Sequence, residues 1–171
     1  MRIVTKFTVG TEQGINDLIE LTSTIATEKF KHLLDSSTLE NYISVHFNEE
    51  ELIREINSLS NQWLIVYVED KAVGYARLTS KGERPAHLSQ QRLIRIADFG
   101  VLPNYHEQTV KKSLLDKCES VAKSYKLAWI NEYLENPLLG FFEANGFFRE
   151  KGVYQMEELP LASTHLIKYF Q

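Results

Sequence analysis

Acidic and phenolic side chains stand on two stretches of the chain that have the composition of buried strands. Asp98 lies within residues 93–102, and Glu132 and Tyr133 lie within residues 129–134. A carboxylate beside a reacting amine can remove its proton, and a phenol can protonate a leaving group. These three residues are the candidate catalytic groups. The alternative for each is ordinary strand-face polarity and packing, and for Asp98 a salt-bridged or solvated role is the preferred interpretation.

The segment that follows residue 102 has the features of an anion-binding helix start. Pro103 ends the predicted strand. A helix is predicted from about Thr109 to Tyr125, because apolar residues recur there at helical spacing: Val110, Leu114, Cys118, Val121 and Tyr125. Backbone N–H groups at a helix start lack partners within the helix, and the macrodipole favours anions there. We therefore expect the N–H groups of residues 107–112 to face an anion.

Residues 136–148 predict a short helix between two strands. Asn136 can cap the helix, and Pro137 fits its first turn because that position needs no backbone donor. Asn145 and Gly146 can supply the left-handed residue that ends it. A strand is expected to begin immediately afterwards, at Phe147.

The rest of the chain supplies further elements. A strand is expected at residues 2–9 and a helix at residues 12–25. Capping patterns predict two short helices, one opened by Ser37 with Glu40 and one opened by Asn48 with Glu51. Strands at residues 63–68 and 73–78 flank a turn at residues 69–71, and the last strand is expected near residues 153–158.

This order of elements predicts an α/β domain. The predicted order is one strand, three helices, three strands, a helix, a strand, a helix and two strands. Such a chain forms a mixed, twisted sheet of about six to seven strands flanked by helices. A chain of 171 residues fits a single domain, which we assign to residues 1–171.

The element order and the segment around Asn136 together resemble the GNAT N-acetyltransferases. In that family the last conserved block typically reads Asn-x-x-Ala-x-x-x-Tyr-x-x-x-Gly-Phe, and here Asn136 precedes a helix that ends in Gly146-Phe147. The resemblance extends from Arg2 to about Leu159. The paired short helices are similar to those of the branch that contains bacterial polyamine-type acetyltransferases, although the acceptor is not carried over from that branch.

The resemblance implies acetyl-CoA as co-substrate and a set of residues that contact it. In the family, backbone groups like those of residues 100–102 polarise the thioester carbonyl, which requires no particular side chain. The helix start binds the pyrophosphate, although His106, Thr109 and Lys111 replace the usual loop residues here. The implied cofactor-binding residues are Gly100, Val101, Leu102, Glu107, Gln108, Thr109, Val110, Lys111, Lys112, Asn136 and Phe142.

The expected acid and base positions depart from the family pattern. Phe142 stands where the family commonly has a proton-donating tyrosine, and the segment is one residue shorter than usual. Arg95 and Ala97 stand where strand carboxylates are often found. Strict alternation along the strand would put Asp98 on the opposite face from these two positions.

The leading functional hypothesis is acetyl transfer from acetyl-CoA to an amine of a small molecule or protein, by direct attack of the deprotonated amine. The altered loop and Phe142 leave a second hypothesis open, in which the scaffold has lost catalysis and binds a ligand or another protein. A homodimer is also left open. No metal site is expected, since the five histidines lack metal-ligand spacing.

Composition narrows the classes of partner. Nineteen basic and 23 acidic residues give a net charge of −4, which does not favour nucleic acid or an anionic membrane surface. A single cysteine, Cys118, cannot form an internal disulfide and fits a reducing compartment. No apolar run approaches the roughly 18 residues of a membrane span, and no signal peptide is apparent. We therefore expect a cytoplasmic protein.

Overall fold

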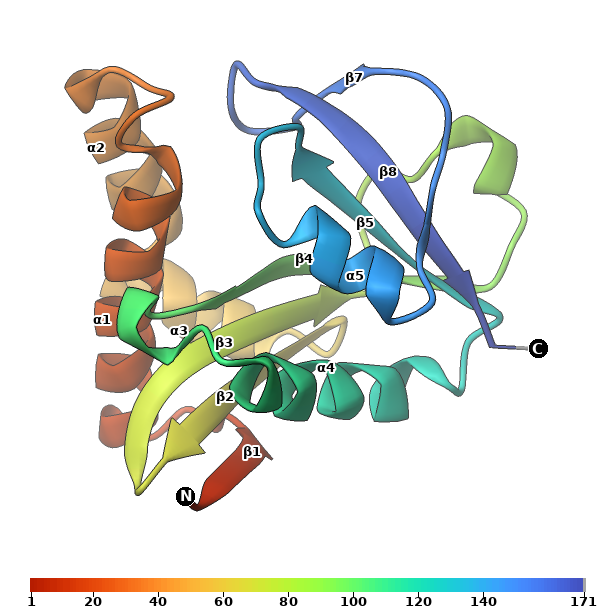
Figure 1. Ribbon diagram of the computed structural model, residues 1–171. Helices are drawn as coiled ribbons and strands as arrows, with labels where there is room; N and C mark the ends of the chain where they lie inside the picture. Colours follow the sequence, from red (N-terminus) through yellow and green to blue (C-terminus); the bar gives the residue numbers. More distant parts are fainter. Residues whose placement is uncertain (171) are drawn as a thin grey trace.

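The computed structural model describes residues 1–170 and forms one mixed β-sheet between two helical layers (Figure 1). Within these residues the sheet has eight strands, in the order β1-β2-β3-β4-β5-β8-β6, with β7 also pairing with β8. The strands are β1 (Ile3–Phe7), β2 (Asn61–Val68), β3 (Lys71–Thr79), β4 (Leu93–Val101), β5 (Leu127–Tyr133), β6 (Phe148–Arg149), β7 (Tyr154–Gln155) and β8 (Ala162–Tyr169). The predicted α/β class is confirmed.

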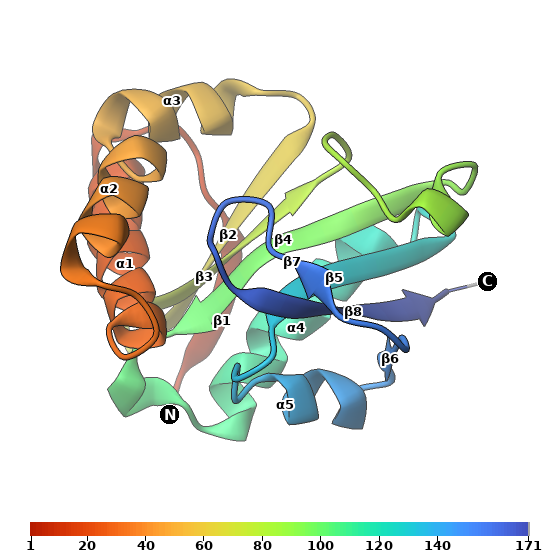
Figure 2. The same cartoon turned by 90° about the horizontal axis from the view of Figure 1, so that it is seen from above.

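Five α-helices cover the two faces of the sheet, as the two views make clear (Figures 1 and 2). They are α1 (Glu12–Phe30), α2 (Ser36–His46), α3 (Glu49–Asn57), α4 (Gln108–Ala122) and α5 (Leu139–Ala144). Helices α1, α2 and α3 lie on one side, and α4 and α5 lie on the other. Each layer has its own apolar core, and fully buried residues such as Leu18 and Leu114 represent the two cores.

Side-chain caps fix most helix starts in the first layer. Thr11 accepts a hydrogen bond from the N–H of Gly14, and Asn48 accepts one from Glu51 at 2.8 Å, as its capping pattern predicts. The start of α2 differs from the prediction. Asp35 is its N-cap, and the Ser37 hydroxyl donates to the Asp35 carboxylate instead of capping the helix itself. The stronger acceptor two residues upstream therefore sets the start of the helix.

The end of the chain contains a strand that the sequence pattern does not reveal. Strand β8 pairs along its length with β5, and Ser163, Thr164 and His165 are buried within it. Because polar residues lie on both faces of β8, a search for apolar runs does not identify it as a buried strand. The strand expected near residues 153–158 is reduced to the two residues of β7. No helix among the described residues is long and apolar enough to span a membrane.

Candidate active site

The central strands β4 and β5 separate after a short parallel contact. They pair only at residues 93–95 of β4 with residues 127–129 of β5, and beyond that point they diverge (Figure 1). The predicted parallel pairing, which the α4 crossover requires, is confirmed. A groove of about 540 Å³ opens at the fork, between the loop after β4 and the turn after β5. We call it the fork groove, and its lining includes Lys29, Val101, Lys111, Tyr133 and Asn136.

Backbone groups of β4 face the fork groove. The N–H of Leu102 donates to the carbonyl of Val73 at 2.8 Å, so strand alternation directs the N–H of Val101 away from β3 and towards the fork. Helix α1 packs directly on this stretch, since a Cβ atom at Gly100 would lie 2.6 Å from the Ile25 side chain. Rigid, unpaired donors beside a groove suit a carbonyl that becomes negatively charged during reaction.

The start of α4 lies at the same groove and has no side-chain cap. Glu107 is the N-cap residue, and its side chain makes no capping hydrogen bond. Within the described residues, no hydrogen bond is recorded for the N–H groups of residues 107–109. Such unpaired donors favour an anion, so this end of the helix fits a phosphate group.

The expected range of free amides is too wide at its C-terminal end. The N–H groups of Val110 and Lys111 both donate to the carbonyl of Glu107, at 3.2 Å, and Lys112 lies further inside the helix. Val110 is also fully buried, so it cannot contact a ligand. Lys111 lines the fork groove, whereas Lys112 forms an ion pair with Asp116 on the α4 surface. Among the described residues the free N–H groups at this helix start are those of residues 107–109; Lys111 lines the fork groove, and Lys112 lines a separate surface hollow with Gln108 and Thr109.

Asp98 lies on the same face of β4 as Arg95, which contradicts the alternation argument. The pairing with β3 shifts between Arg77–Asp98 and Leu78–Ile96, so Ala97 is an extra, bulged residue. A bulge reverses the alternation beyond it. Asp98 is nevertheless salt-bridged, as preferred from the sequence: Lys29 Nζ donates to its carboxylate at 3.1 Å, and the Tyr75 hydroxyl also donates to it.

Lys29 on α1 joins the two halves of the site, and the sequence pattern did not single it out. Its ammonium also donates to the carbonyl of Phe99 at 2.8 Å. Burial alone would lower the pKa of Lys29, but the nearby carboxylates of Asp98 and Glu132 raise it above its ordinary value. A lysine within a helix usually indicates a solvated face. Only the packing of α1 on the fork turns this ammonium inwards.

A small internal cavity of about 30 Å³ lies on the other side of Lys29. We call it the inner cavity, and its lining includes Tyr75, Arg95, Asp98, Asn131 and Glu132. Lys29 lines both the fork groove and the inner cavity. The inner cavity has room for about one small group of the size of water or an amine.

Glu132 is the buried carboxylate of this site that has no ion-pair partner among the described residues. Its Oε2 accepts a hydrogen bond from the Asn136 side chain at 2.7 Å. Burial raises the pKa of Glu132 above its ordinary value, Lys29 and Asn136 lower it in part, and Asp98 adds to the rise. In contrast, Lys29 and Tyr75 outweigh the effect of burial on Asp98 and hold its pKa below the ordinary value. Glu132 is therefore the better proton acceptor.

Tyr133 and Asn136 also meet at the fork. Tyr133 lines the fork groove, and burial raises its pKa to about 12, so the phenol stays protonated at neutral pH. Asn136 does not directly cap α5, which begins at Leu139. Its side-chain oxygen accepts from the N–H of Leu138 at 2.8 Å and closes the turn before the helix. The Asn136 side chain thus positions Glu132 and shapes the groove wall.

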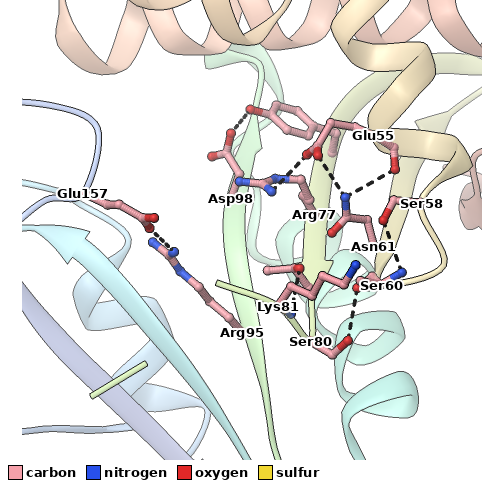
Figure 3. Close-up of polar contacts among 12 residues, drawn as sticks. Glu55, Ser58, Ser60, Asn61, Arg77, Ser80, Lys81, Arg95, Asp98 and Glu157 are labelled. Atoms are coloured by element: carbon pink, nitrogen blue, oxygen red, sulfur yellow. Dashed lines mark hydrogen bonds and ion pairs between the residues drawn. The ribbon is translucent and has the colours of Figure 1, made fainter. Parts of the chain in front are cut away.

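Two ion pairs surround the inner cavity (Figure 3). Arg77 reaches Glu55 of α3 at 3.0 Å and lies close to Asp98, while Arg95 reaches Glu157 at 2.7 Å. Glu157 belongs to the loop between β7 and β8, so this pair ties that loop to β4. Both arginines therefore have carboxylate partners other than Glu132, which leaves Glu132 without an ion pair among the described residues.

The family of the chain follows from comparison with known proteins. Residues 27–147 match the model of the acetyltransferase (GNAT) family. This span contains the fork, the start of α4 and the turn that carries Asn136. The chain belongs to the GNAT acetyltransferase family. Its general reaction is therefore acetyl transfer.

Solved structures share the GNAT fold across nearly the whole chain. The PaiA N-acetyltransferase of Thermoplasma acidophilum, whose structure was determined in complex with coenzyme A, is 16% identical, with 99% of each chain covered and a TM-score of 0.79. A probable acetyltransferase of Staphylococcus epidermidis is 14% identical, with 99% of this chain and 100% of that chain covered and a TM-score of 0.71. At such low identity these likenesses establish the fold alone.

Like Val110, Phe142 is misplaced by the GNAT pattern. It was expected to contact the cofactor, but it is fully buried and packs against Phe99, Phe141 and Phe147 in the core. Helix α5, which carries it, has only six residues. Phe142 therefore serves as core packing.

Proposed function

We propose that the chain transfers the acetyl group of acetyl-CoA to an amine of a small molecule or protein by direct attack. The observation that carries this proposal is the fork. A groove with free backbone donors beside a helix start without a side-chain cap lies on one side of Lys29, and an amine-sized cavity with an ionisable carboxylate lies on the other. Acetyl-CoA would supply the activated acetyl group.

The groove residues fit the proposed co-substrate. The N–H groups of residues 107–109 and the Lys111 ammonium would hold its phosphates, which are anionic. The N–H of Val101 would polarise the acetyl carbonyl. Thr109 adds a side chain where the family commonly has glycine, but Thr109 is exposed, so its hydroxyl can serve as a further donor.

Glu132 would act as the general base. The acceptor arrives mostly as an ammonium, and the Glu132 carboxylate takes its proton. The neutral nitrogen then forms a bond to the acetyl carbon, the carbon–sulfur bond breaks, and its electron pair leaves with sulfur. Tyr133 would give a proton to the departing thiolate, the resulting phenolate would take the second proton from the new amide nitrogen, and Glu132 would release the first proton to solvent. Asp98 would hold Lys29 in place and not react itself.

The test combines binding and turnover. The purified chain is incubated with acetyl-CoA and a panel of primary amines while thiol release is followed, and products are identified by mass. We expect a raised thermal midpoint with coenzyme A, because only the folded state binds it, and acetyl transfer that increases with pH. A thermal shift without any acetylated product would reject catalysis and support a ligand-binding role for the scaffold. The absence of both would reject the proposal entirely.

A further inference from the structure

A further cavity, of about 240 Å³, lies next to the inner cavity and takes no part in the chemistry described above. We call it the outer cavity. Its lining includes Pro85, Trp129, Asn131, Tyr154, Glu157 and His165. Asn131 and Glu157 line both cavities, so the two compartments share a wall. A molecule whose amine enters the inner cavity could therefore extend into the outer one.

Two buried polar atoms in the wall of the outer cavity lack partners among the described residues. They are Nε1 of Trp129 and Oδ1 of Asn131, whose residues are only 4% and 9% exposed. Buried polar side-chain atoms are nearly always hydrogen-bonded, so unpaired ones lining a cavity indicate a ligand or ordered water. The indole N–H can only donate, and the amide oxygen can only accept.

A third unpaired atom in the cavity wall is Nδ1 of His165. It lies 3.9 Å from Oε1 of Glu150, which is beyond hydrogen-bond distance, while the other oxygen of Glu150 pairs with His87 at 2.7 Å. A histidine nitrogen can either donate or accept, so this atom does not distinguish between classes of ligand. The His165 ring instead forms part of a flat wall, because Tyr154 stacks on it with centroids 3.8 Å apart.

The Arg95–Glu157 pair stands where the compartments meet. Its atoms are 2.7 Å apart, and the Arg95 guanidinium lies 4.9 Å from the centre of the Trp129 ring. Glu157 belongs to an exposed loop, so this side of the partition can be reached from solvent. The Arg95–Glu157 pair and Asn131 thus form part of the partition between the two cavities.

We propose that the outer cavity binds a carboxamide or peptide group that the acceptor carries beside its amine. An amide offers one acceptor and one donor in a plane, which matches the Trp129 donor and the Asn131 acceptor. Its flat shape suits walls formed by aromatic rings. The inference rests on the proposed function, since it names the class of acceptor for that same site.

The test compares ω-amino carboxamides with one to five methylenes against n-alkylamines of equal length. For each compound we measure kcat/KM with acetyl-CoA and, separately, Kd by calorimetry. At one chain length we expect the carboxamide to be preferred at least tenfold in both constants. Trp129→Phe removes only the N–H donor and should reduce the preference to about one while alkylamines remain substrates. Asn131→Leu removes the acceptor and should also reduce the preference to about one.

Trp63→Phe is the matched control. Its indole nitrogen is also buried and unpaired, but Trp63 does not line the outer cavity, so this variant should keep the preference. Equal constants for amides and alkylamines in the native chain would overturn the inference and indicate a cavity that holds water only. The same conclusion follows if neither variant changes the preference. Amide-selective binding without any turnover would reject the proposed function but uphold the amide site.

Discussion

At the scale of single residues, the site is a buried set of charged side chains in which one carboxylate, that of Glu132, has no ion-pair partner among the described residues. Asp98 pairs with Lys29, Arg77 pairs with Glu55 outside the inner cavity, and Arg95 pairs with Glu157 at its wall. Among the described residues, Glu132 has only the Asn136 amide as a hydrogen-bond partner. The remaining carboxylate is therefore the group whose titration should be visible in both activity and stability.

Replacing Glu132 with Gln should change activity and stability in opposite directions. Loss of a general base typically lowers kcat/KM by about 10²–10⁴-fold. Because burial raises the pKa of Glu132 in the folded state, the native carboxyl stabilises the fold only at low pH, and this contribution is lost as pH rises through the folded pKa. Glu132→Gln should thus be more stable than the native chain above pH 7, as measured by urea unfolding. Unchanged kcat/KM would remove Glu132 from the mechanism.

Lys29→Met should destabilise the protein strongly, since it leaves a buried carboxylate without its partner. Removing one member of a buried ion pair costs about 3–5 kcal/mol in the free energy of unfolding. The pKa of Asp98 is lowered in the folded state, so its stabilising contribution is present above the unfolded pKa and is lost as pH falls through the folded value. Lys29→Met should weaken this acid sensitivity.

The double variant Lys29→Met, Asp98→Asn is the control for that pair. It removes the uncompensated charge along with the ammonium, so it should recover part of the lost stability. If the double variant is less stable than Lys29→Met alone, the two residues are not coupled as their 3.1 Å contact implies.

At the scale of elements, the start of α4 presents two adjacent lysines in different surroundings. Lys111→Glu should weaken binding of coenzyme A about tenfold, because it places a like charge beside the phosphates. Lys112→Glu should have little effect, since Lys112 lies outside the fork groove. Calorimetric titration of both variants at low and high salt checks this. Equal losses of affinity would mean that the helix does not present its phosphate site towards the fork.

The end of α5 depends on a glycine in the left-handed region. Gly146 has φ +95°, and a Cβ atom there would lie 3.1 Å from the Lys168 side chain. Gly146→Ala should therefore lower the free energy of unfolding by about 1–2 kcal/mol. Gly140→Ala in the same helix is the control, because Gly140 is exposed with open space around it and alanine favours helix there. It should be neutral or stabilising in the same urea titration.

At the scale of the whole molecule, the forked sheet raises the question of whether its two halves unfold together. Trp63 lies in β2, and Trp129 lies in β5, on the other side of β4. The single domain assigned to residues 1–171 remains a prediction. Variants that keep one tryptophan each should give coincident fluorescence transitions in urea, as expected of one cooperative unit. Separate midpoints would divide the chain at the fork.

Features that depend on residues a few positions apart could be predicted from the sequence alone. They include the apolar stripe of α4, the Asn48 cap, the glycine that ends α5 and the α/β order of elements. The likeness to acetyltransferases followed from that order together with one short motif. Each of these signals is set by residues a few positions apart, which is the range over which a helix or a turn is specified.

The side chains of the site come together through the packing of elements that are distant in the chain. Asp98 changes face because β4 gains a bulge against β3, and Lys29 matters because α1 brings it to a carboxylate 69 residues away in the chain. The polar strand β8 is buried only because β5 pairs with it. Strand register and long-range ion pairing arise from the packing of distant elements, so no local periodicity encodes them.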